Sequence, residues 1–221
     1  MGKLINIVTK LHQKTKRNYV KRMMDEKVKC MKIAKKYGRD YWDGKRKYGY
    51  GGYKYIPGRW KAVAKKIIKT YNLKPGSKVL DVGCGKGFLL YEMLLLQPRL
   101  QVTGFDISKY ALINAKKEIK NNLFIHDVRK KTKFKNKKFD LAISLGTLHN
   151  LKIKNLFLAL KEIKRISKKN YIMVESYRNN KELFNLQCWA LTAETIMDVD
   201  SWKWAFKEAK YKGDYEFIYF S

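Results

Sequence analysis

Three glycines stand at alternate positions in the run D-V-G-C-G-K-G, residues 81–87, directly after a short apolar stretch. Because glycine has no side chain, the backbone of a strand-to-helix turn can come close to a ligand there. The spacing is G-x-G-x-G and so differs from the G-x-G-x-x-G of dinucleotide sites. Asp81 precedes the first glycine by two positions. A carboxylate in this place suits a ligand with a cationic amino group better than it suits a pyrophosphate.

Acidic side chains also follow the next two apolar stretches of the chain. Asp106 lies 19 positions after Gly87, and an acid about 20 positions beyond a glycine turn can hold both ribose hydroxyls of an adenosine. Asp127 follows the third apolar stretch, and His149 follows the fourth. In open parallel sheets, ligands bind outside the carboxyl ends of the strands. If each stretch is such a strand, the sequence predicts one ligand site that collects these residues.

From Arg59 onward, short apolar runs alternate with runs of helical periodicity, as they do in βαβ units. The expected strands are 78–82, 102–105, 123–125, 139–144, 171–174 and 215–220. The expected helices are 60–71, 88–96, 109–119, 155–166, 181–191 and 202–209. This alternation predicts an α/β fold in which a parallel sheet is covered by helices on both faces.

The four motifs, taken in chain order, resemble the motif series of class I S-adenosylmethionine-dependent methyltransferases. They read D-V-G-C-G-K-G, G-F-D-I-S, H-D-V and F-D-L-A-I-S-L-G-T-L-H, and the resemblance covers about residues 59–176. It implies a Rossmann-like three-layer α/β sandwich with a seven-stranded sheet and S-adenosylmethionine as the cofactor. The family ends in an antiparallel pair of strands, whereas here two helical runs and one clear strand follow Val174. We therefore expect the C-terminal edge of the sheet to differ.

The resemblance also assigns cofactor contacts to residues at the ends of the four strands. It implies that the glycine turn lines the methionine end, that Asp81 reaches the methionine amino group, and that Asp106 holds the ribose. Residues after the third strand are expected to flank the adenine, and residues after the fourth to border the sulfonium. The full expected set is Asp81, Gly83, Cys84, Gly85, Gly87, Asp106, Ile107, His126, Asp127, Val128, Ser144, Leu145 and Gly146.

Methyl transfer is a displacement at a sulfonium carbon, so the protein mainly aligns the acceptor and excludes water. A base is needed only when the acceptor carries a proton at attack, as a hydroxyl does. Three side chains near the expected site are candidate catalytic residues: His149, Glu175 and Tyr177. A lone histidine is more often structural, and this alternative stays open for His149. Arg178 either pairs with an anionic substrate or forms a surface salt bridge.

The first 58 residues differ in character from the remainder and are expected to extend a methyltransferase domain at 59–221. Residues 1–37 are basic and carry apolar residues at helical spacing, which predicts one or two amphipathic helices that dock onto the core. Residues 38–58 mix glycines, aromatics and charges without a period, which predicts a loop. This loop is either a packed connection or a lid over the active site. Its tyrosines would then cap the substrate pocket: Tyr48, Tyr50, Tyr53 and Tyr55.

The chain carries 50 basic and 19 acidic residues, which gives a net charge of +31. Such a field attracts nucleic acid, anionic lipid or phosphorylated small molecules. The basic residues are, however, 41 lysines and nine arginines, and specific recognition of phosphate favours arginine. A bias in composition therefore remains the alternative to a functional charge.

Two acceptor classes follow from these observations. The first is a small molecule with a hydroxyl, amine or carboxylate, such as a sugar or a phosphorylated metabolite. The second is RNA, with residues 1–37 and the basic run 129–138 as an electrostatic track, although that run also reads as a solvated connection. Neither the N-P-P-Y or D-P-P-Y motif of adenine amino methyltransferases nor a P-C dipeptide is found. The sequence favours the small molecule, and a non-catalytic adenosyl-binding protein is the least favoured reading.

The cysteines predict a reducing compartment. Cys30, Cys84 and Cys188 are odd in number, far apart and without metal-ligand spacing, so we expect free thiols, no structural metal and a cytoplasmic protein. No run approaches the roughly 18 apolar residues of a membrane span, and the N-terminus does not read as a signal peptide. The basic N-terminal helices leave peripheral membrane contact open, and the sequence indicates no oligomeric state.

Overall fold

The computed structural model describes residues 2–221 and contains one sheet of six strands, all parallel. The spatial order is β3-β2-β1-β4-β5-β6. The strands are β1 (Lys78–Val82), β2 (Gln101–Asp106), β3 (Leu123–Ile125), β4 (Phe139–Leu145), β5 (Ser167–Glu175) and β6 (Asp214–Ile218). The α-helices are α1 (Thr9–Gln13), α2 (Tyr19–Met24), α3 (Lys27–Ala34), α4 (Arg39–Asp43), α5 (Lys61–Tyr71), α6 (Phe88–Leu96), α7 (Lys109–Ile113), α8 (Ile153–Ile166), α9 (Asn180–Trp189) and α10 (Val199–Glu208). The 3-10 helices are η1 (Arg46–Tyr48), η2 (Lys120–Asn122) and η3 (Leu148–Asn150).

The central strands β1 and β4 are apolar on both faces because helices cover both. Val79 of β1 pairs with Val102 of β2 on one side and with Leu141 of β4 on the other, and all three side chains are buried. From β1 the chain first adds β2 and β3 on one side of the sheet. It then returns and adds β4, β5 and β6 on the other side of β1. In open α/β sheets, such a reversal leaves a crevice at the carboxyl ends of the two strands, where ligands bind.

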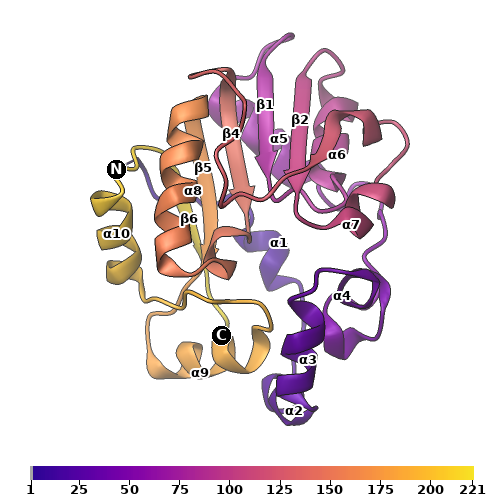
Figure 1. Ribbon diagram of the computed structural model, residues 1–221, viewed down its shortest axis with the longest axis vertical. Helices are drawn as coiled ribbons and strands as arrows, with labels where there is room; N and C mark the ends of the chain where they lie inside the picture. Colours follow the sequence, from indigo (N-terminus) through magenta and orange to yellow (C-terminus); the bar gives the residue numbers. More distant parts are fainter. Residues whose placement is uncertain (1) are drawn as a thin grey trace.

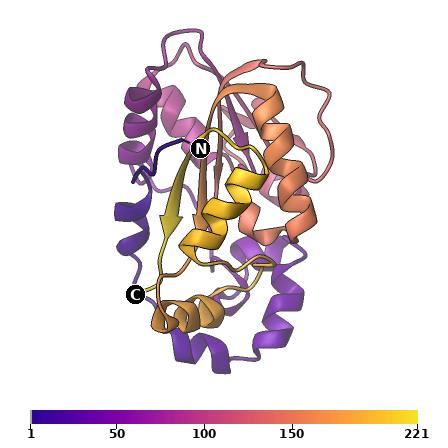
Figure 2. The same cartoon turned by 90° about the vertical axis from the view of Figure 1, so that its left-hand side faces the viewer.

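Helices cover the sheet in two layers, as Figure 2 shows in edge-on view. On one face α5 and α6 pack against the strands through an apolar cluster that includes Ile67 and Leu90. On the other face α8 and α10 form a second cluster that includes Leu160 and Trp202. The Rossmann-like three-layer α/β sandwich that the sequence predicts is thereby confirmed.

The C-terminal edge of the sheet departs from the seven strands that the family resemblance implies, as the sequence after Val174 led us to expect. The described residues form six strands, and β6 runs parallel to β5 instead of belonging to an antiparallel pair. The N-terminus lies along the outer edge of β6: Ile5 N donates to Tyr215 O, and Tyr215 N donates to Lys3 O. These hydrogen bonds partly satisfy an edge that would otherwise present unpaired backbone groups.

Two further expectations about elements were wrong in part. The helix expected over 109–119 ends at Ile113, where Asn114 closes it by a side-chain hydrogen bond from Nδ2 to Tyr110 O. The segment 38–58, expected to be a loop, contains α4 and η1. Helix α4 is a single turn that carries Trp42 into a buried position, so tertiary packing of one large ring outweighs the glycine-rich local sequence.

The N-terminal helices gather at the end of the sheet toward which the strand arrows point (Figure 1). Helix α2 packs against α9, and α3 packs against α4. Lys27 Nζ donates to the carbonyl oxygens of Cys188 and Ala190 and so ties α3 to the end of α9. None of the described helices is long and apolar enough to cross a bilayer. The assignment of 1–58 and 59–221 to separate domains stays a prediction.

Candidate active site

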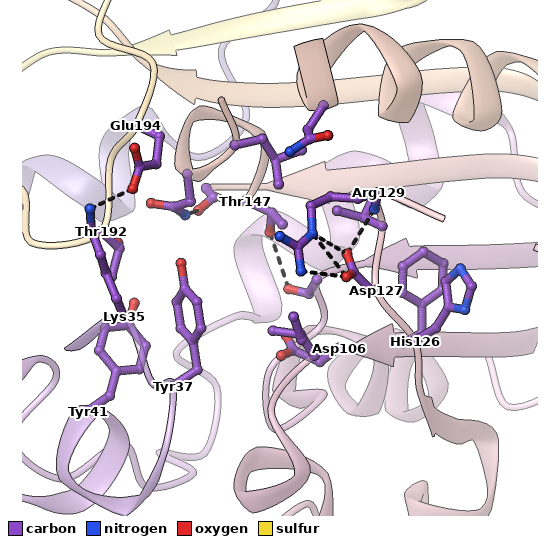
Figure 3. Close-up of a pocket in the computed structure, with 18 of the residues that line it drawn as sticks. Lys35, Tyr37, Tyr41, Asp106, His126, Asp127, Arg129, Thr147, Thr192 and Glu194 are labelled. Atoms are coloured by element: carbon purple, nitrogen blue, oxygen red, sulfur yellow. Dashed lines mark hydrogen bonds and ion pairs between the residues drawn. The ribbon is translucent and has the colours of Figure 1, made fainter. Parts of the chain in front are cut away.

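A cavity of about 370 Å³ lies at the carboxyl ends of β1, β2 and β4. Figure 3 shows its polar wall, in which Asp106, Asp127 and Thr147 face the space from three different strand ends. We call it the first cavity. Eight residues of the expected cofactor set line it: Gly83, Asp106, Ile107, His126, Asp127, Val128, Leu145 and Gly146.

The other five expected cofactor residues, Asp81, Cys84, Gly85, Gly87 and Ser144, do not line this cavity. Ser144 is fully buried, and its hydroxyl donates to Val82 O at 3.0 Å. The turn is tight: Gly87 has a φ of +70°, and a Cβ there would lie 2.6 Å from Ile119 Cδ1. Burial raises the pKa of the Cys84 thiol, which keeps it protonated. The structure therefore gives these residues a supporting position around the turn.

Two carboxylates, Asp81 of β1 and Asp106 of β2, are buried at this end of the sheet, and Asp106 lines the first cavity. Asp106 accepts hydrogen bonds from Gly85 N and Ser108 N, each at 2.8 Å. Burial, and then the charge of Asp106, raise the pKa of Asp81 to about 8. Neither carboxylate forms an ion pair with a described side chain. A ligand with positive charge would relieve this repulsion, so the site fits a molecule that carries an ammonium and a sulfonium group.

The wall formed by the third strand end has its own charge pair. Arg129 Nη2 lies 2.6 Å from Asp127 Oδ2, and Arg129 Nε donates to the same carboxylate. His126 Nε2 lies 3.0 Å from Lys130 O and must carry a hydrogen to bond to it. The sequence placed Arg129 only in a basic run, whereas the structure places it on the cavity wall (Figure 3).

Residues 38–58 cover the glycine turn with aromatic rings. Trp42 donates from Nε1 to Ser108 Oγ at 2.9 Å, and its ring stacks on Tyr50 with centroids 5.2 Å apart. A Cβ at Gly85 would lie 2.8 Å from Trp42 Cη2, so glycine is required here by the cover as well as by its φ of +56°. The Lys86 ammonium, 5% exposed, pairs with Asp43 at 2.7 Å and fixes this cover to the turn.

A second cavity of about 420 Å³ adjoins the first. Both are lined by Tyr41, Tyr50, Leu145, Gly146, Asn150 and Thr192. Of the expected catalytic and substrate residues, four line the second cavity: Tyr50, Tyr53, His149 and Glu175. Because Leu145 and Gly146 border both spaces, an acceptor in the second cavity would meet the cofactor at the end of β4.

Four other residues named from the sequence do not line the two cavities: Tyr48, Tyr55, Tyr177 and Arg178. Tyr55 donates its hydroxyl to Glu92 Oε1 at 2.8 Å and belongs to the packing of the cover. Arg178 pairs with Glu182 and lies over the Tyr219 ring, 4.1 Å from its centroid. The sequence left a salt bridge open as the alternative for Arg178, and the structure places it in one.

His149 and Glu175 come together on the wall of the second cavity. His149 Nδ1 accepts a hydrogen bond from Glu175 N at 3.3 Å, and His149 Nε2 lies 3.4 Å from Glu175 Oε2. Burial lowers the pKa of His149 more than Glu175 raises it, so the ring is neutral at pH 7, and its one hydrogen is on Nε2. The lone pair on His149 Nδ1 already accepts the hydrogen bond from Glu175 N. The Glu175 carboxylate is therefore the available base.

The sequence reading missed the arginines of the second cavity. Arg17, Arg22, Arg46 and Arg59 line it, and the Trp189 ring of α9 lies beside the first three. These residues are separated by up to 172 positions in the chain, and no motif joins them. The one available signal was the uneven distribution of arginine along the chain, since five of the nine arginines fall within the first 59 residues. Among the described residues, no cluster of three or more His, Cys, Asp or Glu is arranged to hold a metal ion.

A family model described as a methyltransferase domain matches residues 73–217, about two thirds of the chain. The chain therefore belongs to the methyltransferase-domain family. The class I methyltransferase domain that the motifs predict is confirmed, with S-adenosylmethionine as the cofactor of this family. The expected assignment of each site residue to a part of this cofactor stays a prediction.

Curated relatives match only part of this methyltransferase. It is 36% identical over 103 residues to the tRNA U34 carboxymethyltransferase of Nautilia profundicola, a match that covers 43% of this chain and 33% of that protein. It is also 36% identical over 89 residues to the ribosomal RNA small subunit methyltransferase C of Buchnera aphidicola, with 39% and 26% covered. The chain thus spans a third or less of the length of these relatives.

Solved structures share the fold of the methyltransferase. A SAM-dependent methyltransferase from Aquifex aeolicus superposes with a TM-score of 0.50 at 21% identity. The superposition covers 70% of this chain and 83% of that one. At this identity the likeness shows the α/β architecture, and the acceptor must be argued from the second cavity.

Proposed function

We propose that the methyltransferase moves a methyl group from S-adenosylmethionine to a small-molecule acceptor that binds in the second cavity. The observation that carries this proposal is the junction of the two cavities at Tyr41, Tyr50, Leu145 and Gly146. The second cavity is also walled by residues of the first 60 positions and by α9. A concave site bounded by several segments of the chain suits a metabolite better than a folded nucleic acid.

The cofactor supplies a methyl group that is already activated by a sulfonium, so the chain mainly binds, orients and excludes water. Asp81 and Asp106 would attract the positive charges and hold the ribose. Trp42 and Tyr50, stacked over the glycine turn, would keep water from the reacting carbon. Leu145 and Gly146 would place the acceptor atom opposite that carbon.

Glu175 is the group that would take a proton from a hydroxyl or ammonium acceptor. Its carboxylate is 23% exposed and lines the second cavity, where a bound acceptor can reach it. His149 would act as a positioning residue, since its two nitrogens both face Glu175. A neutral imidazole beside the carboxylate can orient it without cancelling its charge.

RNA is the second candidate acceptor, because two of the relatives are named for transfer RNA and for ribosomal RNA. The charge of +31 is compatible with binding a polyanion. An RNA base would have to leave its stack and enter the second cavity, at a cost of a few kcal/mol. The matches to these relatives cover less than half of the chain, so they do not by themselves carry an RNA acceptor over to it.

The test is a methyl-transfer assay with labelled S-adenosylmethionine, run separately on a metabolite extract and on total RNA. We expect label in the metabolite fraction. The Glu175→Gln variant should lose about 10²–10⁴-fold in kcat toward a hydroxyl acceptor while calorimetric affinity for the cofactor is kept. Glu208→Gln, an exposed change on α10, is the matched control. Label in RNA alone would reject the small-molecule proposal, and an unchanged kcat in Glu175→Gln would reject the role of this carboxylate.

A further inference from the structure

Three guanidinium groups surround one indole ring on the wall of the second cavity. The Cζ atoms of Arg17, Arg22 and Arg46 lie 5.4, 4.6 and 5.1 Å from the centroid of Trp189. We call these four residues the arginine cluster. They come from the α1–α2 connection, α2, η1 and the end of α9, so only the folded chain brings them together. They line the second cavity and not the first, so the cluster is not part of the cavity proposed for the cofactor.

The described side chains supply no ion pair to the three arginines of the cluster. Their hydrogen bonds go to backbone carbonyls and to one histidine: Arg22 donates to Arg46 O at 2.8 Å, and Arg17 donates to Thr15 O at 2.9 Å. Burial and then Arg17 lower the pKa of His12 to about 4, so this partner is neutral. Burial and then Arg46 lower the pKa of Arg22 to about 10. Three like charges thus stand together with no ion-pair partner among the described side chains.

Unsatisfied polar atoms point to the same cavity. In the described part of the chain, three buried side-chain polar atoms have no hydrogen-bond partner: Arg17 Nε, Trp60 Nε1 and Asn150 Oδ1. All three residues line the second cavity. A buried donor without a partner costs about 1–3 kcal/mol, and such groups are rare in native structures unless function, a water or an ion accounts for them. Two of the three atoms are N–H donors, as an anionic ligand requires.

We propose that the arginine cluster binds an oxyanion of the acceptor, a carboxylate or a phosphate, and thereby selects acidic small molecules. This inference rests on the proposed function. The planar fork of a guanidinium matches both groups in a bidentate fashion. An oxyanion held bidentately by these guanidinium groups has its lone pairs engaged, so it is not the group that accepts the methyl. The methylated product therefore keeps its negative charge, and the nucleophile is a separate hydroxyl or amine of the same molecule.

The sequence suggested that Arg178 pairs with an anionic substrate, but Arg178 pairs with Glu182. We assign the binding of the substrate anion to the arginine cluster instead. Glu175 favours the charged form of Arg17 through space and so opposes the lowering of its pKa by burial. The proposed base therefore stands within electrostatic reach of the cluster. The cluster, this carboxylate and Leu145 all line the second cavity. One molecule could then meet the anion site, the base and the methyl donor at once.

The test measures binding of two probes, inorganic phosphate and malonate, by calorimetry at constant ionic strength. The variant Arg22→Gln/Arg46→Gln removes two charges of the cluster. Its control, Lys21→Gln/Lys45→Gln, removes two charges from the neighbouring exposed positions. We expect the arginine variant to bind at least about tenfold more weakly, and the control to bind like the unchanged protein. The probe that binds more tightly assigns the class of anion.

The same titrations include S-adenosylmethionine, whose retained affinity reports an intact fold. If the double arginine variant loses it, Arg17→Gln with Lys16→Gln as control replaces that pair. No binding of either probe to the unchanged protein, or an equal loss in variant and control, would overturn the arginine cluster as an anion site. Because the measurement needs no turnover, it is independent of the assay on metabolites and RNA, and either proposal can fail alone.

Discussion

Two single residues, Asp81 and Asp106, provide a site for a cation within a strongly basic protein. Both carboxylates are buried, and no described side chain forms an ion pair with either. The Coulomb repulsion between them is tolerable when one is protonated, which is why the pKa of Asp81, raised first by burial and then by Asp106, lies at about 8. Binding of a cationic amino group would reverse this preference. The unliganded site is therefore destabilised in a way that its ligand relieves.

Asp81→Asn is expected to weaken S-adenosylmethionine binding and to remove its pH dependence. With a pKa of about 8, the ionised fraction of Asp81 rises about tenfold per pH unit below that value. Affinity of the unchanged protein should thus rise from about pH 6 to about pH 7, where an α-amino group is still mostly protonated. Calorimetry at several pH values measures this. Asp200→Asn, 91% exposed, is the control, and a flat profile in the unchanged protein would contradict the assignment.

The same raised pKa affects the stability of the unliganded protein. The folded-state pKa of Asp81, about 8, lies above the unfolded value of about 3.9. Unfolding therefore favours the ionised form, and stability falls as the pH rises between the two values. The neutral amide that Asp81→Asn introduces escapes this loss, so the Tm of the variant in the absence of cofactor should exceed that of the unchanged protein at neutral pH. Thermal unfolding at pH 5 and pH 7.5 measures the difference, and an advantage that does not grow with pH would count against the raised pKa.

At the scale of elements, Glu216 of β6 holds the N-terminal segment in place. This carboxylate is fully buried and accepts hydrogen bonds from the backbone nitrogens of Ile7, Val8 and Thr9. It also accepts from the hydroxyls of Thr9 and Tyr171. Helix α1 thus has its first backbone donors satisfied by a side chain more than 200 positions away, because its own N-cap residue Val8 offers no side-chain acceptor.

Glu216→Gln should loosen the N-terminal segment and leave the sheet folded. A neutral amide replaces a carboxylate that accepts from five N–H and O–H donors, and hydrogen bonds to a charged group are worth about 1.5–3 kcal/mol each. Hydrogen-exchange mass spectrometry should find faster exchange in residues 2–24, with exchange in β1 and β4 unchanged. Glu118→Gln on the surface is the control. Equal protection of residues 2–24 in both variants would refute the anchoring role.

At the scale of the whole molecule, the net charge of +31 acts as self-repulsion. The Debye length falls to about 10 Å at 0.1 M salt, so added salt screens the lysines from one another. We expect the Tm in sodium chloride to rise between about 0.02 M and about 0.2 M. Differential scanning calorimetry checks this, with sucrose at matched osmolality as control. A Tm that falls with salt would mean that surface ion pairs, such as Lys168 with Asp140, outweigh the repulsion.

The sequence by itself determined the α/β alternation, the first five strands in outline and the identity of the cofactor. Local patterns suffice there, because buried strands are short apolar runs and because the ligand site lies where those strands end. It did not determine that β6 runs parallel to β5, or that Lys3 and Ile5 lie along its outer edge. Edge pairing depends on which distant segment is available, and local periodicity does not report this.

Only the tertiary structure decided the walls of the second cavity. Arg17, Arg22, Arg46 and Trp189 lie in four separate segments, and each taken alone reads as an ordinary basic or apolar residue. The pairing of His149 with Glu175 likewise depends on the register between β4 and β5. Residues that bind the shared cofactor sit in motifs at fixed spacing, whereas residues that select an acceptor are drawn from wherever the folded chain encloses space. The sequence therefore identified the methyl donor, and the fold is needed to propose the acceptor.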